Sequence, residues 1–421
     1  MAVLLLGTLD TKGEEYALVR DLITAAGQDV ILVDTGVMGS ATPQPHPGTA
    51  PAPRAGLVPD VPAEDVAEAA GTSLERLRSA GDRGAALATM AAGATAIARD
   101  LHARGQVSGV LALGGSGGSS IAAAVMRALP VGLPKLLVST MVSGDVSAYV
   151  GETDVTLMYS VVDVAGVNSI SRRILGNAAA AISAMAAAHD ARSEPVGEDK
   201  PLVAATMFGV TTPAVDAARA RLESLGYEVL VFLATGSGGR AMEALAADGH
   251  FAGVLDLTTT ELADELVGGV LSAGPDRLTA AGNAGVPQVV SLGAVDMVNF
   301  GPMETVPERF RRRRLLVHNP SVTLMRTTPA ENAEIGRAVG ERLARASGPV
   351  ALFVPRGGVS AVDVDGGPFH DPEADAACFD AVLAAVAGSA VEVVQSDQDI
   401  NSAEFAVAAA DRLHRLIQKG A

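Results

Sequence analysis

The chain has 421 residues, of which 48% are hydrophobic and 3% aromatic, and its formal net charge is −17. This length predicts two to three domains with large cores. The acidic balance excludes a general nucleic-acid-binding protein, because neutralising a phosphate backbone requires a basic face. The one basic run, RFRRRR at residues 309–314, is open to a local role or to simple charge balance.

The cellular compartment can be predicted from the number of cysteines and from the N-terminal residues. A single cysteine, Cys378, excludes a disulfide framework and indicates a reducing compartment. The N-terminal stretch MAVLLLGTLDTKG lacks a basic region and is typical of a first strand, not of a signal peptide. No stretch reaches the roughly 18 uncharged apolar residues of a membrane helix. We therefore expect a cytoplasmic protein.

Apolar strand-like runs alternate with Ala-rich helical stretches along the whole chain. In the first half they predict strands over 2–6, 30–33, 107–113 and 135–138, and this alternation is typical of parallel sheets covered by helices. Residues 41–62 hold seven of the 22 prolines and predict an extended surface excursion. That excursion is either a plain loop or a cover over a cleft.

The second half repeats the order of the first after the linker DARSEPVGEDKP. SGVLALGGSGG matches AGVLDLTTTEL, and VGLPKLLVSTMVSGDV matches AGVPQVVSLGAVDMVNF. We therefore predict an α/β fold of two doubly wound, Rossmann-like parallel-sheet domains related by internal duplication, with an interdomain cleft. The predicted boundaries are a nucleotide-binding domain over 1–190, a linker over 191–200 and a second domain over 201–421, on the substrate or partner side.

The glycine cluster GGSGGSS at residues 114–120 lies between a strand and a helix. Its backbone N–H groups, next to a helix N-terminus, predict a phosphate site, with Ser119 or Ser120 as the N-cap. A plain glycine-rich turn is the alternative. No Gly-Lys-Ser/Thr follows, so the cluster is not a P-loop, and it departs from the dinucleotide fingerprint in its third glycine and in the missing acid.

Polar residues gather at the other carboxyl ends of the predicted strands, where an open parallel sheet binds its ligand. Lys12 follows the first strand and can pair with phosphate as a point charge. The carboxylates of Asp10, Asp34 and Asp145 are candidates for holding Mg²⁺ on a nucleoside polyphosphate.

The second half carries residues suited to acid-base chemistry. His318 is the preferred acid-base candidate because histidine titrates near neutral pH, and Arg326 follows it closely. Glu261 ends the run TTTE, in which one threonine is a helix N-cap. Glu261 and Asp264 lie one helical turn apart and form either a carboxylate pair or metal ligands, with a solvated helix face as an equally good interpretation. The sequence contains no His and Cys residues at the spacing of a metal site, and no G-x-S-x-G motif of a serine hydrolase.

Long motifs then identify a resemblance that spans essentially the whole chain. They include GTLDTKGEE, ALGGSGGSS, PKLLVSTMVSGDV, MYSVVDVAGVNSISRRIL, PQVVSLGAVDMVNFG, VHNPSVTLMRTTPAENAEIG and GGPFHDPEADAACFDAV. The chain resembles the bacterial and plant family that contains the ATP-binding N-terminal domain of the tomato mosaic virus resistance protein. That family implies two Rossmann-like domains. The plant protein binds a viral replication protein, and we do not expect its antiviral role to transfer.

The resemblance also implies ATP binding with Mg²⁺, and Asp10 and Asp145 are the metal candidates. By motif, the nucleotide residues are Thr8, Asp10, Gly36, Gly114, Gly115, Ser116, Gly117, Gly118, Ser119, Ser139, Thr140 and Asp145, beside Lys12 from its position.

We therefore expect an ATP-binding protein, in its leading form an ATP-dependent enzyme acting on a small metabolite in the interdomain cleft. Glu261, His318 and Arg326 would serve that substrate. The alternatives are a nucleotide-regulated protein-binding module without turnover, or an enzyme that binds a phosphosugar or another anion. We also expect a homo-oligomer, with no direct nucleic-acid or membrane partner.

Overall fold

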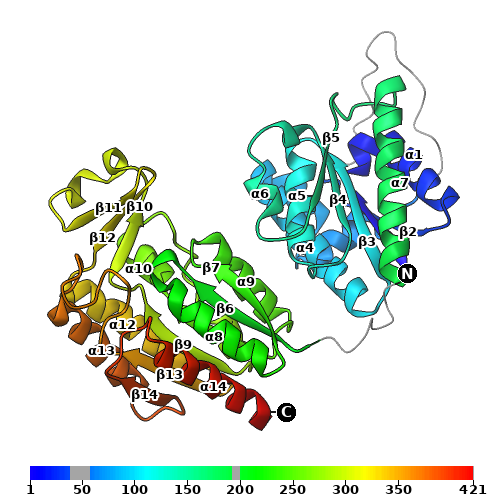
Figure 1. Ribbon diagram of the computed structural model, residues 1–421. Helices are drawn as coiled ribbons and strands as arrows, with labels where there is room; N and C mark the ends of the chain where they lie inside the picture. The colour runs from blue at the N-terminus through cyan, green and yellow to red at the C-terminus, as the bar shows by residue number, and fades with distance from the viewer. Residues whose placement is uncertain (38–56, 192–199, 421) are drawn as a thin grey trace. The chain divides into compact units, whose positions relative to one another are not determined.

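The computed structural model describes residues 1–37, 57–191 and 200–420. The chain divides into two compact units, Met1–Glu198 (unit 1) and Asp199–Ala421 (unit 2), which are drawn in Figure 1. Most of the proline-rich excursion lies outside the described residues. Its last part is described, and there Val61 forms a parallel bridge with Val33.

Unit 1 is built on a five-stranded parallel sheet with the order β2-β1-β3-β4-β5. Its strands are β1 (Ala2–Gly7), β2 (Asp29–Asp34), β3 (Val107–Gly114), β4 (Lys135–Ser139) and β5 (Thr156–Tyr159). Its helices are α1 (Leu9–Ala25), α2 (Ala63–Ala69), α3 (Leu74–Ala80), α4 (Arg83–Ala103), α5 (Ser116–Arg127), α6 (Ser147–Val150) and α7 (Ser169–Ala191), with the short η1 (Thr140–Ser143). The four predicted strands are confirmed.

The sheet of unit 1 is covered on both faces. Every residue of β1 and β3 is buried, which explains their continuous apolar sequences. Within β1, Leu4 and Leu6 pack in a cluster with α2, α4 and α5, whereas Val3 and Leu5 pack with α1 and α7. Figure 1 shows α1 and α7 together on one side of this sheet.

Unit 2 repeats this order and extends it, in a six-stranded parallel sheet ordered β14-β13-β9-β8-β6-β7. The strands are β6 (Leu202–Met207), β7 (Glu228–Leu233), β8 (Gly253–Thr258), β9 (Gln288–Gly293), β13 (Val350–Pro355) and β14 (Glu392–Ser396). A separate antiparallel sheet holds β10 (Met297–Phe300), β12 (Val322–Arg326) and β11 (Leu315–Asn319) in that order.

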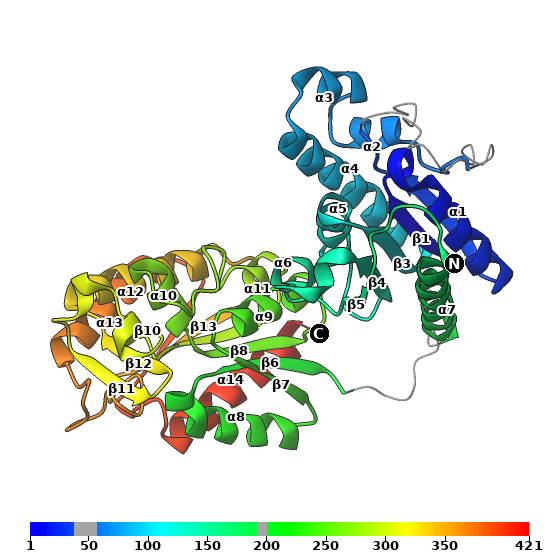
Figure 2. The same ribbon diagram turned by 90° about the horizontal axis from the view of Figure 1, so that it is seen from above.

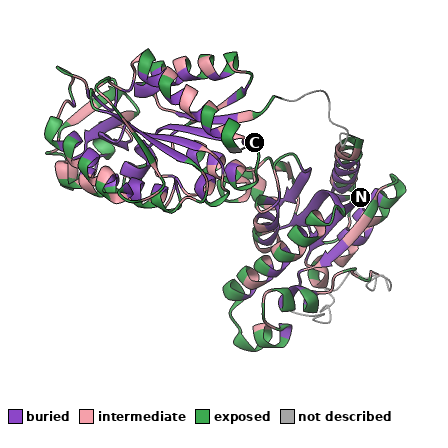
Figure 3. Cartoon of the chain, turned by 90° about the horizontal axis from the view of Figure 1, so that it is seen from below, coloured by how far each residue is buried: buried purple, intermediate pink, exposed green. Residues whose placement is uncertain are grey.

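The helices of unit 2 form two layers. They are α8 (Thr212–Ser224), α9 (Ser237–Ala247), α10 (Thr260–Val267), α11 (Ala280–Asn283), α12 (Pro329–Ala344), α13 (Pro372–Val386) and α14 (Ala403–Gly420), with η2 (Gly209–Thr211), η3 (Met303–Thr305) and η4 (Glu308–Phe310). Helices α8 and α14 pack together on one face, and α12 and α13 pack together on the other (Figure 2). Figure 3 shows the buried central strands of both large sheets, whereas the edge strands β2, β5, β7 and β14 are only partly buried.

The two units therefore share a doubly wound topology, in which the second strand lies outside the first and the third to fifth follow on the other side. This is the 2-1-3-4-5 variant of the doubly wound fold. Because β3 matches β8 and β4 matches β9 in both order and position, the topology agrees with the duplication predicted from the sequence.

Candidate functional site

A pocket of about 520 Å³ opens at the carboxyl edge of the unit 1 sheet. It lies where the loops after β1 and β3 separate, which is the switch point of this topology and the place where doubly wound folds bind ligands. Four segments line it, and they contribute Thr8, Asp10, Thr11 and Lys12; Thr35 and Val37; Leu77, Arg78, Gly81, Asp82, Arg83, Ala86 and Leu87; and Gly115, Ser116, Gly117 and Gly118.

The glycine cluster forms the first turn of α5. The helix begins at Ser116, and Gly115 is its N-cap without a side-chain cap. The backbone N–H of Ser119 donates to the carbonyl of Gly115 at 2.9 Å, whereas the N–H groups of Ser116, Gly117 and Gly118 have no acceptor within the described residues. Such N–H groups, together with the positive end of the helix dipole, favour a bound anion.

The predicted serine cap was wrong, because the helix starts earlier than expected. Ser119 lies inside the first turn, and its buried hydroxyl contacts the Ser139 hydroxyl at 2.6 Å. Ser120 donates its hydroxyl hydrogen to the carbonyl of Ser116 at 2.9 Å. Ser119 and Ser139 thus fix β4 against α5 behind the pocket.

Two glycines permit close packing around the site. A Cβ on Gly114 would lie 3.1 Å from the Cα of Gly118, and a Cβ on Gly36 would lie 2.7 Å from the Cγ of Asp10. A Cβ on Gly117 would instead lie 3.6 Å from Leu87 and 3.7 Å from the Arg83 guanidinium, at ordinary contact distance. Gly117 therefore faces the pocket, between an apolar and a cationic side chain.

Three cations line the pocket, namely Lys12, Arg78 and Arg83. Arg78 donates to the carbonyl of Val37 at 2.5 Å, whereas Arg83 makes no hydrogen bond or ion pair with any described residue. Sequence reasoning missed both arginines because it considered only the ends of strands. Arg78 lies in α3 and Arg83 is the first residue of α4, whose N-cap Asp82 accepts from the N–H of Ala85 at 3.0 Å.

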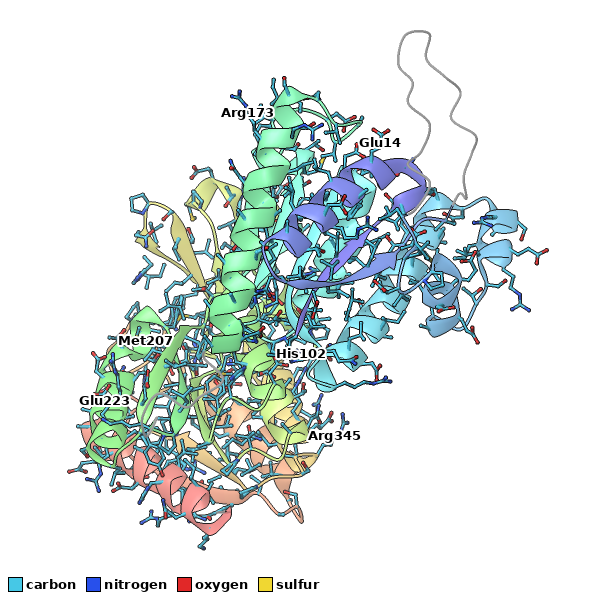
Figure 4. All side chains as sticks on the ribbon, turned by 90° about the vertical axis from the view of Figure 1, so that its right-hand side faces the viewer. Glu14, His102, Arg173, Met207, Glu223 and Arg345 are labelled. Carbon is cyan, nitrogen blue, oxygen red and sulfur yellow. The ribbon has the colours of Figure 1, made fainter. Side chains whose placement is uncertain are left out.

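Two side chains of α1 hold the segment that joins β5 to α7. The Lys12 ammonium donates to the carbonyl of Val164, and the N–H of Gly166 donates to the Glu15 carboxylate. Figure 4 shows α1, which carries the labelled Glu14, and α7, which carries the labelled Arg173. Helices α1 and α7 also contact each other. Because Lys12 both lines the pocket and donates to Val164, it links the pocket to the segment between β5 and α7.

The predicted carboxylates have different surroundings. Asp34 accepts from the N–H groups of Leu9 at 3.0 Å and Gly36 at 2.8 Å, and burial raises its pKa. Asp34 therefore positions the loops after β1 and β2. Asp10 lines the pocket, whereas Asp145 is exposed and accepts from the N–H of Ser147 at 2.9 Å, which lowers its pKa.

Ser139, Thr140 and Asp145 are not among the residues that line the pocket. Thr140 lies beside it, with its hydroxyl 3.7 Å from the position of a Cβ on Gly115. Across the described ranges, no group of three His, Cys, Asp or Glu side chains is arranged to hold a metal ion.

In unit 2, Glu261 belongs to a buried ion cluster. Its carboxylate accepts from the N–H groups of Gly236 at 2.7 Å and Gly239 at 3.1 Å, at the start of α9, and from the Arg277 guanidinium at 2.7 Å. The fully buried Arg277 also donates to Asp256 at 2.8 Å. An internal carboxylate thus occupies the helix N-terminus at which an external anion would bind.

The other two predicted catalytic residues have separate surroundings. Arg326 is buried and donates to Asp375 at 2.5 Å and to Asp363 at 3.2 Å, whereas His318 is exposed on β11. The hydrogen bonds of Glu261 go to the start of α9 and to Arg277, away from both residues. The structure does not bring the three residues to one pocket in the part of the chain that it describes.

The switch point of unit 2 carries different side chains from that of unit 1. There Thr211 and Thr258 join their hydroxyl groups at 2.8 Å. An apolar cluster that includes Val210, Ala294 and Phe369 packs beside them, with Leu324 of β12. The duplicated topology therefore places different side chains at the two switch points.

Comparison with known proteins matches both units. Residues 1–191 match the N-terminal domain, and residues 200–417 the C-terminal domain, of the Uncharacterised protein family UPF0261. The chain belongs to the UPF0261 family. It is 49% identical over 417 residues to a UPF0261 protein of Clostridium tetani, covering 99% of each chain. It is 47% identical to a UPF0261 protein of Rhizobium meliloti, covering 97% of each chain.

A plant relative extends the family. The ToMV resistance protein Tm-1(GCR237) of Solanum lycopersicum is 42% identical over 356 residues, which cover 83% of this chain and 47% of the tomato protein. The resemblance predicted from the motifs is thus confirmed. No helix among the described residues of this UPF0261 protein is long and apolar enough to cross a membrane.

Proposed function

We propose that unit 1 binds a nucleotide, with its phosphates at the first turn of α5. The observation that carries this proposal is the group of three N–H groups without acceptors among the described residues, at Ser116, Gly117 and Gly118, in a pocket that Arg83 and Lys12 also line. Backbone donors, a helix dipole and cations together stabilise a polyanion. The volume, about 520 Å³, is in the range of small-molecule sites, roughly 300–1,000 Å³.

The remaining wall of the pocket suits the base of a nucleotide. Leu77 of α3 and Ala86 and Leu87 of α4 form an apolar lining, together with Val37 from the loop after β2. A phosphosugar offers no flat apolar group for this wall, so the lining favours a nucleotide over that alternative. Among nucleotides, ATP is the one that the sequence resemblance implies.

Mg²⁺ would accompany the phosphates of a nucleoside triphosphate and would neutralise part of their charge. Asp10 is the carboxylate that lines the pocket and would hold the ion, directly or through water. Asp145 does not line it, so its role as a ligand has weaker support.

Isothermal titration with ATP, ADP, AMP and ribose 5-phosphate, each with and without Mg²⁺, tests the ligand class. We expect measurable affinity for ATP, weaker binding as phosphates are removed, and the weakest binding for the sugar phosphate. Ribose 5-phosphate binding as tightly as ATP would favour the phosphosugar alternative, and the absence of any heat with ATP would refute the proposal.

We also propose that the nucleotide serves an enzyme acting on a small metabolite in the cytoplasm, as a homo-oligomer. ATP consumption measured against a panel of small acids and sugars distinguishes this from a nucleotide-regulated binding module. Tight ATP binding without consumption in the presence of any of these compounds would favour the module.

A further inference from the structure

Unit 2 has a small pocket of its own, of about 170 Å³, between the loop after β13 and the start of α13. Four ionisable side chains line it: Arg356, Asp363, His370 and Asp375. They come from two stretches, PRGGVSAVD and GGPFHDPEADAACFDAV, that nucleotide binding by unit 1 does not use. The pocket also lies at the carboxyl edge of a parallel sheet, where doubly wound folds bind ligands.

Asp363 and Asp375 of the lining belong to a buried cluster behind the pocket, in which carboxyl groups outnumber cations. Arg326 donates to Asp375 at 2.5 Å and to Asp363 at 3.2 Å. A third carboxylate, Asp296, is buried in the same cluster and accepts from the Ser360 hydroxyl at 2.8 Å through Oδ2. Its Oδ1 has no hydrogen-bond partner among the described residues. One guanidinium thus faces three buried carboxyl groups, a costly arrangement for purely structural purposes.

Burial favours the protonated form of a carboxyl group in this cluster. Burial, with the nearby charges of Asp296 and Asp375, raises the pKa of Asp363 to about 8, although Arg326 opposes the shift. The N–H of Val359 donates to the same carboxyl group at 3.2 Å. Asp363 and Asp375 both accept from Nη2 of Arg326, so their carboxyl groups lie side by side and form a pair that can share a proton. Such a pair can donate a hydrogen bond to a carbonyl or hydroxyl oxygen of a ligand.

The rim of the pocket carries donors for an anion. Arg356 is exposed, and it contacts the side-chain oxygen of Gln395 at 2.8 Å through Nε. His370 places one ring nitrogen, Nδ1, in a buried position without a hydrogen-bond partner among the described residues, and its Nε2 lies 4.0 Å from Asp365. A guanidinium and an imidazole beside one small cavity favour a carboxylate.

We propose that this pocket binds a small 2-oxo or 2-hydroxy acid. The carboxylate lies at Arg356 and His370, and the oxo or hydroxyl oxygen lies at Asp375, the partly exposed member of the pair, with the fully buried Asp363 behind it. The volume equals that of roughly six water molecules at about 30 Å³ each, which limits the ligand to a few carbon atoms. The site is independent of the nucleotide pocket and would give unit 2 the metabolite-binding role.

Saturation-transfer NMR on the full chain with pyruvate, lactate and propionate tests the proposal. Propionate lacks the second oxygen and is the control ligand. We expect pyruvate or lactate to bind at least about tenfold more tightly than propionate, and Arg356→Ala to weaken that binding about tenfold. Arg219→Ala, at an exposed arginine of α8, is the matched control and should bind as the wild type does. No saturation transfer to pyruvate or lactate, or equal binding of all three acids, would overturn the proposal, and so would binding insensitive to Arg356→Ala.

The pH dependence tests the carboxyl pair separately. Above pH 8, Asp363 loses its proton, and the added negative charge repels the acid, so wild-type binding should fall between pH 7 and pH 9.5. Asp363→Asn keeps a donor and gains no charge, and its oxygen can still accept from the N–H of Val359. We expect its binding to persist at pH 9.5. Wild-type binding that does not change with pH would contradict the role of the pair.

Discussion

The ammonium group of Lys12 donates a hydrogen bond to the backbone carbonyl of Val164, although the two residues are 152 positions apart in the sequence. Lys12 also lines the pocket at the carboxyl edge of unit 1, and it interrupts the helical backbone of α1 with φ −132° and ψ 27°. Val161, three residues before Val164, has a φ of 62°, which is strained for a β-branched residue. The segment over 160–168 is thus held in place from the pocket.

Replacing Lys12 should therefore affect both the ligand and the segment. Lys12→Met removes a cation from the phosphate site and the donor to Val164. We expect about tenfold weaker ATP binding and faster hydrogen-deuterium exchange across 160–168, measured by mass spectrometry. Lys419→Met, at the exposed end of α14, is the control and should change neither. Unchanged exchange in 160–168 would show that Lys12 does not hold the segment.

Arg83 should contribute to binding and not to stability, because no described residue pairs with it. A hydrogen bond to a charged group contributes about 1.5–3 kcal/mol, so Arg83→Ala should weaken ATP binding roughly tenfold to a hundredfold. The melting temperature of the Arg83→Ala variant should equal that of the wild type. Arg76→Ala, on α3 but outside the pocket lining, is the control. Equal affinity in the two variants would remove Arg83 from the site.

Arg277 should be essential for the stability of unit 2. It is fully buried and pairs with Asp256 and Glu261, so Arg277→Met leaves buried carboxylates without their cation. Removing one partner of a buried ion pair costs about 3–5 kcal/mol, which urea denaturation can measure. ATP affinity at unit 1 should be retained under native conditions. A loss below about 1 kcal/mol would contradict the assigned role of this cluster.

Asp264 should make the stability of unit 2 depend on pH. Burial raises the pKa of this carboxyl to about 7 in the folded chain, from an ordinary value of 3.8. Because the folded state binds the proton more tightly, the free energy of unfolding falls as pH rises from about 4 to 7, by up to about 1.4 kcal/mol per pH unit. Above pH 7 this contribution is lost and the dependence levels off.

The variant Asp264→Asn tests this directly. Asn299 donates its side-chain amide to Asp264 at 2.7 Å, and its own Oδ1 is buried without a hydrogen-bond partner in the described residues. A flipped Asn299 amide can therefore accept from the new asparagine. Urea denaturation from pH 5 to 8 should show the variant gaining stability relative to the wild type as pH rises. A constant difference would mean that Asp264 does not titrate in this range.

The fold could be predicted from the sequence where the sequence pattern of an element was strong. β1 and β3 are uninterrupted apolar runs, and the repeated motifs alone are enough to pair the corresponding strands of the two units. The same reasoning located the glycine cluster at a sheet edge. It did not find Arg83, because this residue reaches the pocket from the start of α4, a position that depends on how α3 and α4 pack.

Tertiary contacts also determine that Glu261 is a buried partner of an ion pair. The run TTTE follows a strand, as a catalytic residue would, but Arg277 folds back over it from a loop 16 residues later. Nothing local in the sequence indicates that an arginine in a loop is fully buried. Histidine chemistry at His318 was inferred from residue type and from the closeness of Arg326 in the sequence, but the structure places His318 exposed on β11 and Arg326 buried in an ion cluster.

The most direct test of nucleotide binding at α5 is isothermal titration of ATP into the wild type, Gly117→Val and Gly176→Val. A Cβ on Gly117 lies 3.6 Å from Leu87, so the valine methyl groups would extend into the pocket, whereas Gly176 in α7 has open space around it. We predict that binding is abolished in Gly117→Val and unchanged in Gly176→Val. Wild-type affinity in Gly117→Val would contradict the account.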